Sequence, residues 1–255
     1  NIVKDKFTWS TSVNFAKNIN EVLSIGNNGI LEDIGSNLFV GQPLNSNYFY
    51  EFDGIWQLDE AEEAAVYGQL PGSVKVVDQN QDGKISSAPG EDDRVILGSE
   101  QPDWTMGITN KFTFGNIDLS FLAYTVQGVQ FRNNFLSGTM GEVGNGRYNA
   151  LNLNYWTPDN PTNDYFGAGI PNPYRQAIQY QDASFIRISD ITLGYTLPTE
   201  LSSDVLGLQN LRIYAQVINP FIFHDFDGID PEFNSSAYND DVSSTTILLG
   251  VKCTF

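Results

Sequence analysis

The chain is dominated by long segments in which apolar and polar residues alternate one by one. In residues 104–114 and 117–125 nearly every second side chain is apolar, and the residues between them are mostly Thr, Ser, Gly or Asp. Such alternation places the apolar side chains on one face of a β-strand and the polar ones on the other. Gly115 and Asn116 between the two segments predict a tight hairpin turn. The pattern therefore predicts an all-β, antiparallel fold.

Four further segments share this alternation: residues 7–19, 185–196, 211–219 and 245–255. We expect strands of about 9–13 residues, which is the length needed to cross a bilayer at a tilt and exceeds the usual five or six of soluble sheets. The small polar residues of one face suit a wet lumen better than a dry core. Arg187 interrupts the apolar face of its segment. Cys253 lies on the apolar face of the last segment and is expected to face lipid.

The connections between these segments alternate in length. Residues 115–116 form a short connection and 197–210 a moderate one, whereas 20–103, 127–184 and 220–244 are long. Short turns on one side and long loops on the other are typical of outer-membrane β-barrels. Because short and long connections alternate, the C-terminus lies on the same side as the short turns. The pattern therefore predicts a periplasmic C-terminus and acidic long loops at the cell surface. Six strands do not close a barrel, which needs about eight, so further strands are expected upstream or from another chain.

Composition narrows the classes of function. The chain has 31 acidic and 13 basic residues and a net charge of −18, which argues against a nucleic-acid surface. One cysteine and one histidine, His224, exclude a disulfide framework and a cysteine-based zinc site and leave little room for histidine-dependent catalysis. The sequence contains no run of about 18 apolar residues, so it does not predict a transmembrane helix. In the first long connection, residues 58–67 predict a short helix, with Asp59 as candidate N-cap.

One segment resembles the first half of a calcium-binding loop. The run D-Q-N-Q-D-G-K begins at Asp78 and offers oxygen ligands at its first, third, fifth and seventh positions, as hard Ca²⁺ prefers. The twelfth position is Pro89 instead of Glu, so the last ligand is expected from the acids that follow a small insertion. The candidate ligands are Asp78, Asn80, Asp82, the Lys84 carbonyl, Asp92 and Asp93. The alternative is a solvated, empty acidic turn.

Aromatic residues are abundant, with 17 Phe, 12 Tyr and 4 Trp. Those in the long connections could stack on sugar rings or hold a peptide, or they could simply pack among the loops. The candidate substrate residues are Trp56, Tyr155, Trp156 and Tyr165. Trp9 and Trp104 lie near strand ends and are expected to anchor the sheet at membrane interfaces.

Several segments, in order along nearly the whole chain, resemble SusC/RagA-type TonB-dependent outer-membrane transporters. They are FTWSTSVNFAKNINEVLSI from Phe7, YEFDGIWQLDEAEEAAVYGQLPG from Tyr50, DDRVILGSEQPDWTMGITNKF from Asp92, SFIRISDITLGYTLP from Ser184, LRIYAQVINPF from Leu211 and DGIDPE from Asp227. No single motif is decisive, but the ordered set is specific.

The resemblance implies that residues 1–255 are the C-terminal part of a 22-stranded barrel whose plug and earlier strands lie outside this chain. It implies import of oligosaccharides or peptides, a SusD-like lipoprotein as lid over the surface loops, energy from TonB through the absent part, and no enzymatic activity. The insertion before Asp92 departs from a complete calcium loop.

Two other classes of protein remain open at this point. A secreted, calcium-stabilised β-sandwich that binds glycans would have shorter strands with one face in a dry core. A glycoside hydrolase would need two carboxylates about 5–10 Å apart in a cleft; adjacent acids such as Asp92-Asp93 and Asp240-Asp241 are candidates.

Overall fold

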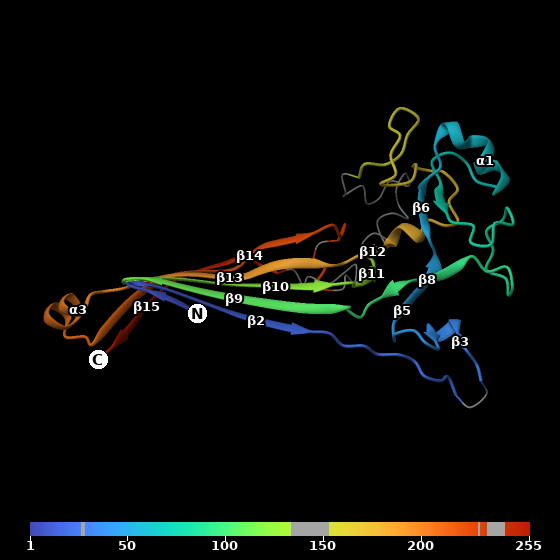
Figure 1. The fold of residues 1–255 in the computed structure, drawn as a ribbon. Helices are drawn as coiled ribbons and strands as arrows, with labels where there is room; N and C mark the ends of the chain where they lie inside the picture. Colours follow the sequence, from blue (N-terminus) through green and yellow to red (C-terminus); the bar gives the residue numbers. More distant parts are fainter. Residues whose placement is uncertain (27–28, 134–152, 229, 234–242) are drawn as a thin grey trace.

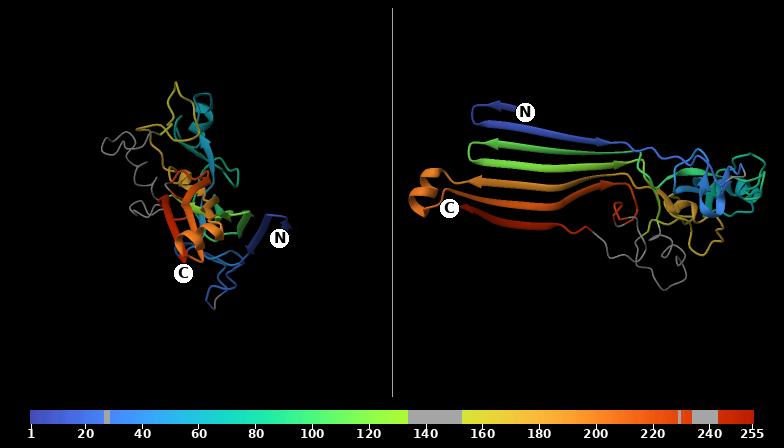
Figure 2. Two further views of the ribbon diagram at one scale, coloured as in Figure 1. Left: turned by 90° about the vertical axis from the view of Figure 1, so that its left-hand side faces the viewer. Right: turned by 90° about the horizontal axis from the view of Figure 1, so that it is seen from below.

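A computed structural model describes residues 1–26, 29–133, 153–228, 230–233 and 243–255. Its main feature is a seven-stranded antiparallel sheet with the order β1-β2-β9-β10-β13-β14-β15 (Figure 1). The strands are β1 (Ile2–Lys4), β2 (Phe7–Ala16), β9 (Trp104–Phe114), β10 (Ile117–Gln127), β13 (Phe185–Thr196), β14 (Asn210–His224) and β15 (Thr246–Thr254). Figure 2 shows them side by side in a single long layer.

All six predicted strands are present. β9 and β13 have the predicted bounds, β10 and β14 extend further, and β2 ends three residues earlier, at Ala16. The predicted turn at Gly115 and Asn116 joins β9 to β10. The seventh strand, β1, was not predicted because three residues are too short to show alternation.

The register separates the sheet into two chemically different faces, because directly paired residues of neighbouring strands lie on the same face. One row across the sheet is apolar: Trp9, Phe112, Leu119, Leu193, Ala215 and Leu249. The next row, on the opposite face, is mostly polar: Ser10, Lys111, Ser120, Thr192, Gln216 and Leu248. The predicted alternation is thus present in three dimensions.

A register shift in β13 corrects the interpretation of Arg187. The pairing with β10 and β14 is irregular between Ile188 and Asp190, so one residue is inserted and the alternation restarts in the opposite phase. Arg187 pairs with Tyr124 and lies on the polar face. The sequence analysis expected Arg187 to interrupt the apolar face, and this expectation was wrong.

The apolar face is not covered by any second layer in the described part of the chain. Phe15 is 64% exposed and Leu249 is 82% exposed. Asn110 is one of the polar residues on this face, and it accepts hydrogen bonds from Trp9 Nε1 at 3.0 Å and Thr11 Oγ1 at 2.6 Å. A β-sandwich would bury these apolar side chains against a second sheet, so that alternative does not fit the fold.

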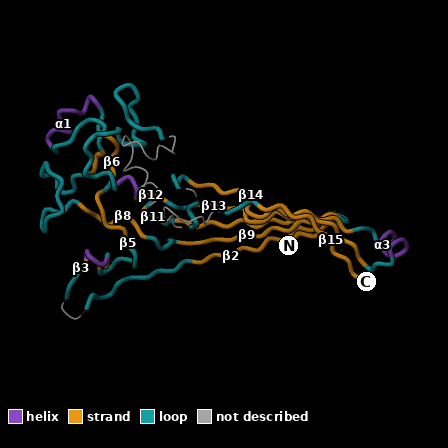
Figure 3. The backbone as a smooth tube through the Cα atoms, turned by 180° about the vertical axis from the view of Figure 1, so that it is seen from behind, coloured by secondary structure: helices purple, strands orange, loops and turns teal. Residues whose placement is uncertain are grey.

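The described residues of the first two long connections form a separate unit at one end of the sheet, here called the head (residues 20–26, 29–103, 129–133 and 153–183; Figure 3). Its strands are β3 (Glu32–Asp33), β4 (Leu38–Phe39), β5 (Ser46–Tyr50), β6 (Phe52–Ile55), β7 (Val74–Val76), β8 (Arg94–Ser99), β11 (Gln130–Arg132) and β12 (Tyr180–Asp182), paired as four two-stranded sheets. Residues of β6, β7 and the later segments of the head form a core: Ile55, Val74, Val76, Trp156, Tyr165, Phe166, Ala177 and Ile178. The connections therefore have a hydrophobic core of their own.

Three helical segments matter for the predictions. The expected helix is present as a 3-10 turn, Leu58–Glu60, followed by α1 (Ala61–Val66). Its N-cap is Gln57, whose N–H donates to Glu60 Oε2 at 2.9 Å, so the assignment of Asp59 as N-cap was wrong. α3 (Thr199–Leu206) lies at the turn end of the sheet, opposite the head, and was not predicted. No helix in the described ranges is both long and apolar enough to cross a membrane.

Candidate functional site

The polar face of the sheet carries a charged pair near its turn end. Arg212 Nε donates to Asp118 Oδ1 at 2.9 Å, and a second guanidinium nitrogen lies 2.5 Å from Asp118 Oδ2. The Arg212 side chain crosses Gly194 to reach the carboxylate, and a Cβ at that position would collide with both partners. Glycine at 194 therefore permits a two-point ion pair.

A second charged group fixes the segment after β14 against the polar face near the head. Arg187 and Asp230 are 3% and 5% exposed, and one guanidinium nitrogen lies 2.7 Å from each Asp230 oxygen. Glu232 approaches Arg187 Nε at 3.0 Å and accepts a 2.5 Å hydrogen bond from the Tyr124 hydroxyl. A buried arginine requires such partners because an unpaired buried charge is strongly destabilising.

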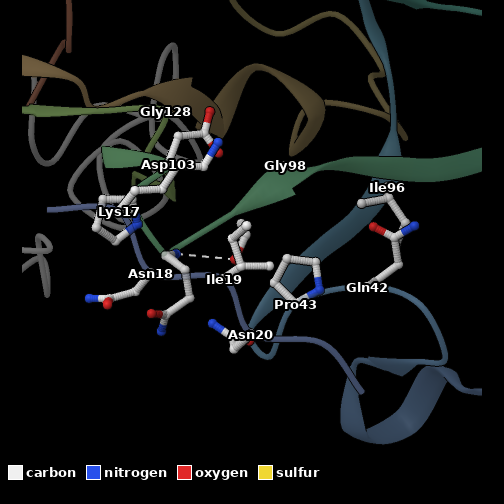
Figure 4. A pocket seen from close by; sticks show the side chains of 13 residues that line it. Lys17, Asn18, Ile19, Asn20, Gln42, Pro43, Ile96, Gly98, Asp103 and Gly128 are labelled. Carbon is white, nitrogen blue, oxygen red and sulfur yellow. Dashed lines mark hydrogen bonds between the residues drawn. The ribbon is translucent and has the colours of Figure 1, made fainter. Parts of the chain in front are cut away.

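A cleft lies where the sheet meets the head, here called the junction cleft (Figure 4). Its volume is about 280 Å³. It is lined by the chain leaving β2, by residues 42–43, by the end of β8 and the chain that leads into β9, and by Gly128. The lining residues are Lys17, Asn18, Ile19, Asn20, Gln42, Pro43, Ile96, Gly98, Ser99, Gln101, Pro102, Asp103 and Gly128.

The junction cleft is rich in unused polar groups. The side chains of Lys17, Asn18, Gln42, Gln101 and Asp103 make no hydrogen bond or ion pair within the described residues. Such groups can donate to or accept from a polar ligand without first breaking an internal contact. The sequence interpretation missed these residues because amides scattered over three separate segments form no motif.

The position of the Asp103 carboxylate depends on the neighbouring Gly128. Its N–H donates to Gln127 O at 2.9 Å, and its carboxylate packs directly over Gly128. Gly128 has φ of +75°, a conformation that favours glycine, and a Cβ there would collide with the Asp103 carboxylate. Gly128 therefore determines where the negative charge of the cleft lies.

The calcium-like loop is closed by its own main chain. Asp78 accepts hydrogen bonds from the N–H groups of Gln81 at 2.7 Å and Gly83 at 2.8 Å. Burial alone would raise the pKa of Asp78, but these N–H donors outweigh it and hold the pKa below its usual value. Asp82 Oδ1 accepts from the N–H of Lys84 at 2.9 Å, and Asn80 lies beside Asp82.

The two acids predicted to complete the calcium loop have different surroundings. Asp93 is fully buried and accepts from the N–H groups of Gln79 at 3.0 Å and Ser86 at 2.8 Å. Asp92 instead binds Arg94, with N–O distances of 2.6 and 2.9 Å, and accepts from the Tyr48 hydroxyl at 3.1 Å.

The predicted calcium site stays a prediction, and these contacts describe its loop. Asp92 forms an ion pair with Arg94. Among the described residues, no three or more His, Cys, Asp or Glu side chains are gathered where they could share a metal ion. The oxygens expected to bind calcium accept main-chain N–H groups, so the loop keeps its shape through those hydrogen bonds.

The candidate substrate aromatics are mostly buried. Trp56 is 3% exposed, stacks on Tyr67, and carries the Lys75 ammonium 4.4 Å from its ring centroid. Trp156 is 5% exposed and donates from Nε1 to Gln57 Oε1 at 2.9 Å. These two rings are buried within the head, and their predicted contact with cargo stays a prediction.

The two remaining candidate rings, Tyr155 and Tyr165, differ in accessibility. Tyr165 is 9% exposed, and burial, followed by the neighbouring Asp227, raises the pKa of its phenol. Tyr155 is 42% exposed. Of the four predicted substrate residues, Tyr155 alone keeps a ring accessible to a ligand.

The adjacent acids considered for glycoside hydrolysis do not form a catalytic pair. Asp92 is bound to Arg94 and Asp93 accepts main-chain N–H groups, whereas a glycosidase needs two carboxylates facing one cleft. Asp240-Asp241 lies outside the described residues.

Comparison with known proteins identifies relatives over nearly the whole chain. The chain is 30% identical to TonB-dependent receptor P3 of Formosa agariphila over 97% of its own length, and 27% identical to TonB-dependent receptor SusC of Bacteroides thetaiotaomicron over 100%. It spans about a quarter of these relatives, 25% of each. No family model matches.

Solved structures show the same fold. The RagAB peptide transporter matches with a TM-score of 0.74 at 22% identity, over 100% of this chain and 28% of the matched chain. The RagAB peptide importer in its open-open state matches with a TM-score of 0.70, also at 22% identity, over 99% of this chain and 27% of that chain.

The fold is the antiparallel sheet that the RagAB peptide transporter also contains, and the sequence is similar to part of TonB-dependent receptors. The resemblance to SusC/RagA-type TonB-dependent transporters is confirmed by relatives at 24–30% identity.

Proposed function

We propose that this chain forms part of the wall of an outer-membrane importer that takes up oligosaccharide or peptide nutrients in a TonB-dependent manner. The observation that carries the proposal is the two-faced sheet, apolar and uncovered on one side and polar on the other. A bilayer covers such an apolar face, and a water-filled or plugged lumen suits the opposite face. The similarity to SusC and to the RagAB peptide transporter supports this reading.

Under this proposal, the two ends of the sheet lie on opposite sides of the membrane. The end with the two-residue turn and α3 would face the periplasm, and the head would lie at the cell surface, as expected when short turns and long loops alternate. A SusD-like lipoprotein lid would then contact the head, while TonB would act through parts of the protein outside this chain.

The function proposed is binding and passage without bond chemistry. Two ion pairs lie on the polar face, Arg212 with Asp118 and Arg187 with Asp230. Paired charges can shape a polar lumen without presenting a reactive acid or base. The junction cleft adds polar side chains where the sheet meets the head.

Uptake by cells tests the proposal. A strain lacking the gene for the full-length protein, a complemented strain and a strain lacking TonB would be given labelled peptides and labelled oligosaccharides. We expect loss of uptake of one class in both deletion strains and recovery on complementation. Equal uptake by all strains, or recovery of the protein outside the outer-membrane fraction, would contradict the proposal.

A further inference from the structure

We infer that residues 225–228 and 230–233, here called the strap, limit the size of what passes the head end of the lumen, and that Arg187 holds the strap in place. This inference rests on the proposed import function and concerns its selectivity. The strap contains all but one residue of the DGIDPE segment, which is no part of the sheet itself.

The strap crosses the polar face of the sheet instead of continuing in line with β14. β14 ends at His224, its neighbour in the sheet is β13, and β10 lies beyond β13. Glu232 nevertheless accepts a 2.5 Å hydrogen bond from the hydroxyl of Tyr124, a residue of β10. Tyr124 pairs with Arg187 on the polar face. Since neighbouring strands lie about 4.8 Å apart, the strap and its side chains reach roughly 10 Å across this face.

The first part of the strap is anchored at the base of the head. Phe226 is 3% exposed and packs with Val129 and Ala183. Next to this ring, Gln181 Nε2 donates to Asp227 Oδ2 at 2.8 Å, and Gln181 Oε1 accepts from the Asp227 N–H at 3.2 Å. An apolar contact and two hydrogen bonds therefore fix the point from which the strap turns onto the sheet.

The second part of the strap is held by charge. One guanidinium nitrogen of Arg187 lies 2.7 Å from each oxygen of the buried Asp230, and Glu232 Oε2 lies 3.0 Å from Arg187 Nε. Burial alone would raise the pKa of Asp230, but hydrogen bonds from Arg187 and from the N–H of Glu232 hold it below its usual value. Removing one partner of such a buried pair is strongly destabilising, so Arg187 decides whether the strap stays on the sheet.

A strap in this position narrows the passage. Under the proposed function the polar face lines the lumen, so a chain that crosses this face occupies part of the cross-section of the lumen. The other ion pair of the polar face differs in this respect. Arg212 and Asp118 both belong to strands, β14 and β10, so their contact adds no further chain to the lumen. The narrowing is therefore specific to the head end.

Hydrogen exchange of the full-length protein in detergent tests whether Arg187 holds the strap. Arg187→Gln should lower the protection of the strap by about 100-fold or more, because a buried carboxylate loses its partner. Tyr124→Phe keeps the ring that packs on Phe185 and loses one hydrogen bond to Glu232, so it should lower protection about 10-fold. Arg212→Gln is the matched control and should leave the strap unchanged. Protection of β9 in each variant checks that the sheet is folded.

Uptake of probes of graded length tests whether the strap limits passage. Strains with the full-length parent or one of the three variants would be given labelled oligoalanines and labelled maltodextrins, each of three and of twelve units. In the class that the parent imports, we expect the short probe to enter faster than the long one. Arg187→Gln should raise the ratio of long to short uptake several-fold, Tyr124→Phe should raise it less, and Arg212→Gln should keep the ratio of the parent. A merely structural role would change uptake of both lengths equally.

The two measurements together decide the inference. Unchanged protection of the strap in Arg187→Gln, a freed strap with the length ratio of the parent, or an equal change in Arg212→Gln would overturn it. If Arg187→Gln does not reach the outer membrane, Tyr124→Phe decides by the same two measurements. Import by the parent with an unaltered ratio in the variants contradicts the strap alone, whereas uptake by none of the strains contradicts the proposed function and the size limit with it.

Discussion

The head and the sheet bury their apolar side chains in opposite ways. In the head, Ile55 is 1% exposed and Trp156 is 5% exposed, whereas in the sheet Phe15 and Leu249 are 64% and 82% exposed. The head folds its apolar residues against one another and the sheet presents them outward. The difference teaches that the two regions suit different surroundings, water for the head and, under the proposed function, lipid for one face of the sheet.

The strongest way to break this comparison is to remove the centre of the head core. Trp156→Ala should destabilise the head by about 3–5 kcal/mol, because a large buried ring is replaced by a cavity. Hydrogen exchange of the full-length protein in detergent should rise across β6 and β7 but stay unchanged in β9 and β13. The matched control is Tyr155→Ala, a neighbouring ring that is 42% exposed. Equal loss of protection in the sheet would show that head and sheet unfold as one unit.

A charged residue introduced on the apolar face of the sheet tests whether that face contacts lipid. Ile191 pairs with Phe121 and Val217 on the apolar face, and the adjacent Thr192 lies on the polar face. Ile191→Arg should cost about 2–4 kcal/mol in phospholipid vesicles, since a cation near the bilayer midplane is poorly solvated. Thr192→Arg should cost much less. Urea unfolding of the full-length protein gives both values, and equal costs would mean that the face does not contact lipid.

The ion pair of Asp92 and Arg94 makes part of the stability of the head dependent on pH. Hydrogen bonds from Arg94 lower the pKa of Asp92, although burial opposes the shift. The stabilisation is therefore complete above the unfolded pKa of about 3.9 and is lost as the pH falls through the lower folded pKa. The neighbouring Tyr48 has its pKa raised to about 12 by burial and by Asp92, so its phenol stays protonated in this range.

Replacing the Asp92 carboxylate tests this pH dependence of head stability. Asp92→Asn should lower head stability by about 1.5–3 kcal/mol at pH 7, because charge-assisted hydrogen bonds are weakened. The variant should also lose less stability than the parent between pH 5 and pH 3. Exchange rates of β5 and β8 provide the measurement, with Asp59→Asn as an exposed control. An identical acid response in parent and variant would contradict the assignment.

The sheet could be predicted from the sequence because its pattern is local. The bounds of β9 and β13 follow directly from residues that alternate within one strand. Even the irregularity in β13 is visible afterwards, since its apolar residues are spaced by two at Ile186 and Ile188 and by three before Ile191. The strict two-residue rule made Arg187 look misplaced because the inserted residue was not considered.

The head and the junction cleft could not be predicted because they depend on contacts distant in sequence. Strands of two to six residues, such as β6, show too few alternations to stand out. Trp156 contacts Gln57, a residue 99 positions earlier. The burial of Trp56 and Trp156 in the head was therefore not visible in the sequence, and the amides that line the cleft form no motif.

Removal of calcium is expected to have the smallest effect. Both Asp93 oxygens accept main-chain N–H groups, Asp78 does the same, and Asp92 is held by Arg94. The loop is thus closed by hydrogen bonds and needs no ion to satisfy its carboxylates. We expect a chelator such as EGTA to leave the exchange protection of β7 and β8 unchanged, and added Ca²⁺ to do the same. A rise in protection with Ca²⁺ that disappears in Asp78→Asn would contradict this expectation, because Asp78 would then be an ion ligand as the D-x-N-x-D-G pattern predicts.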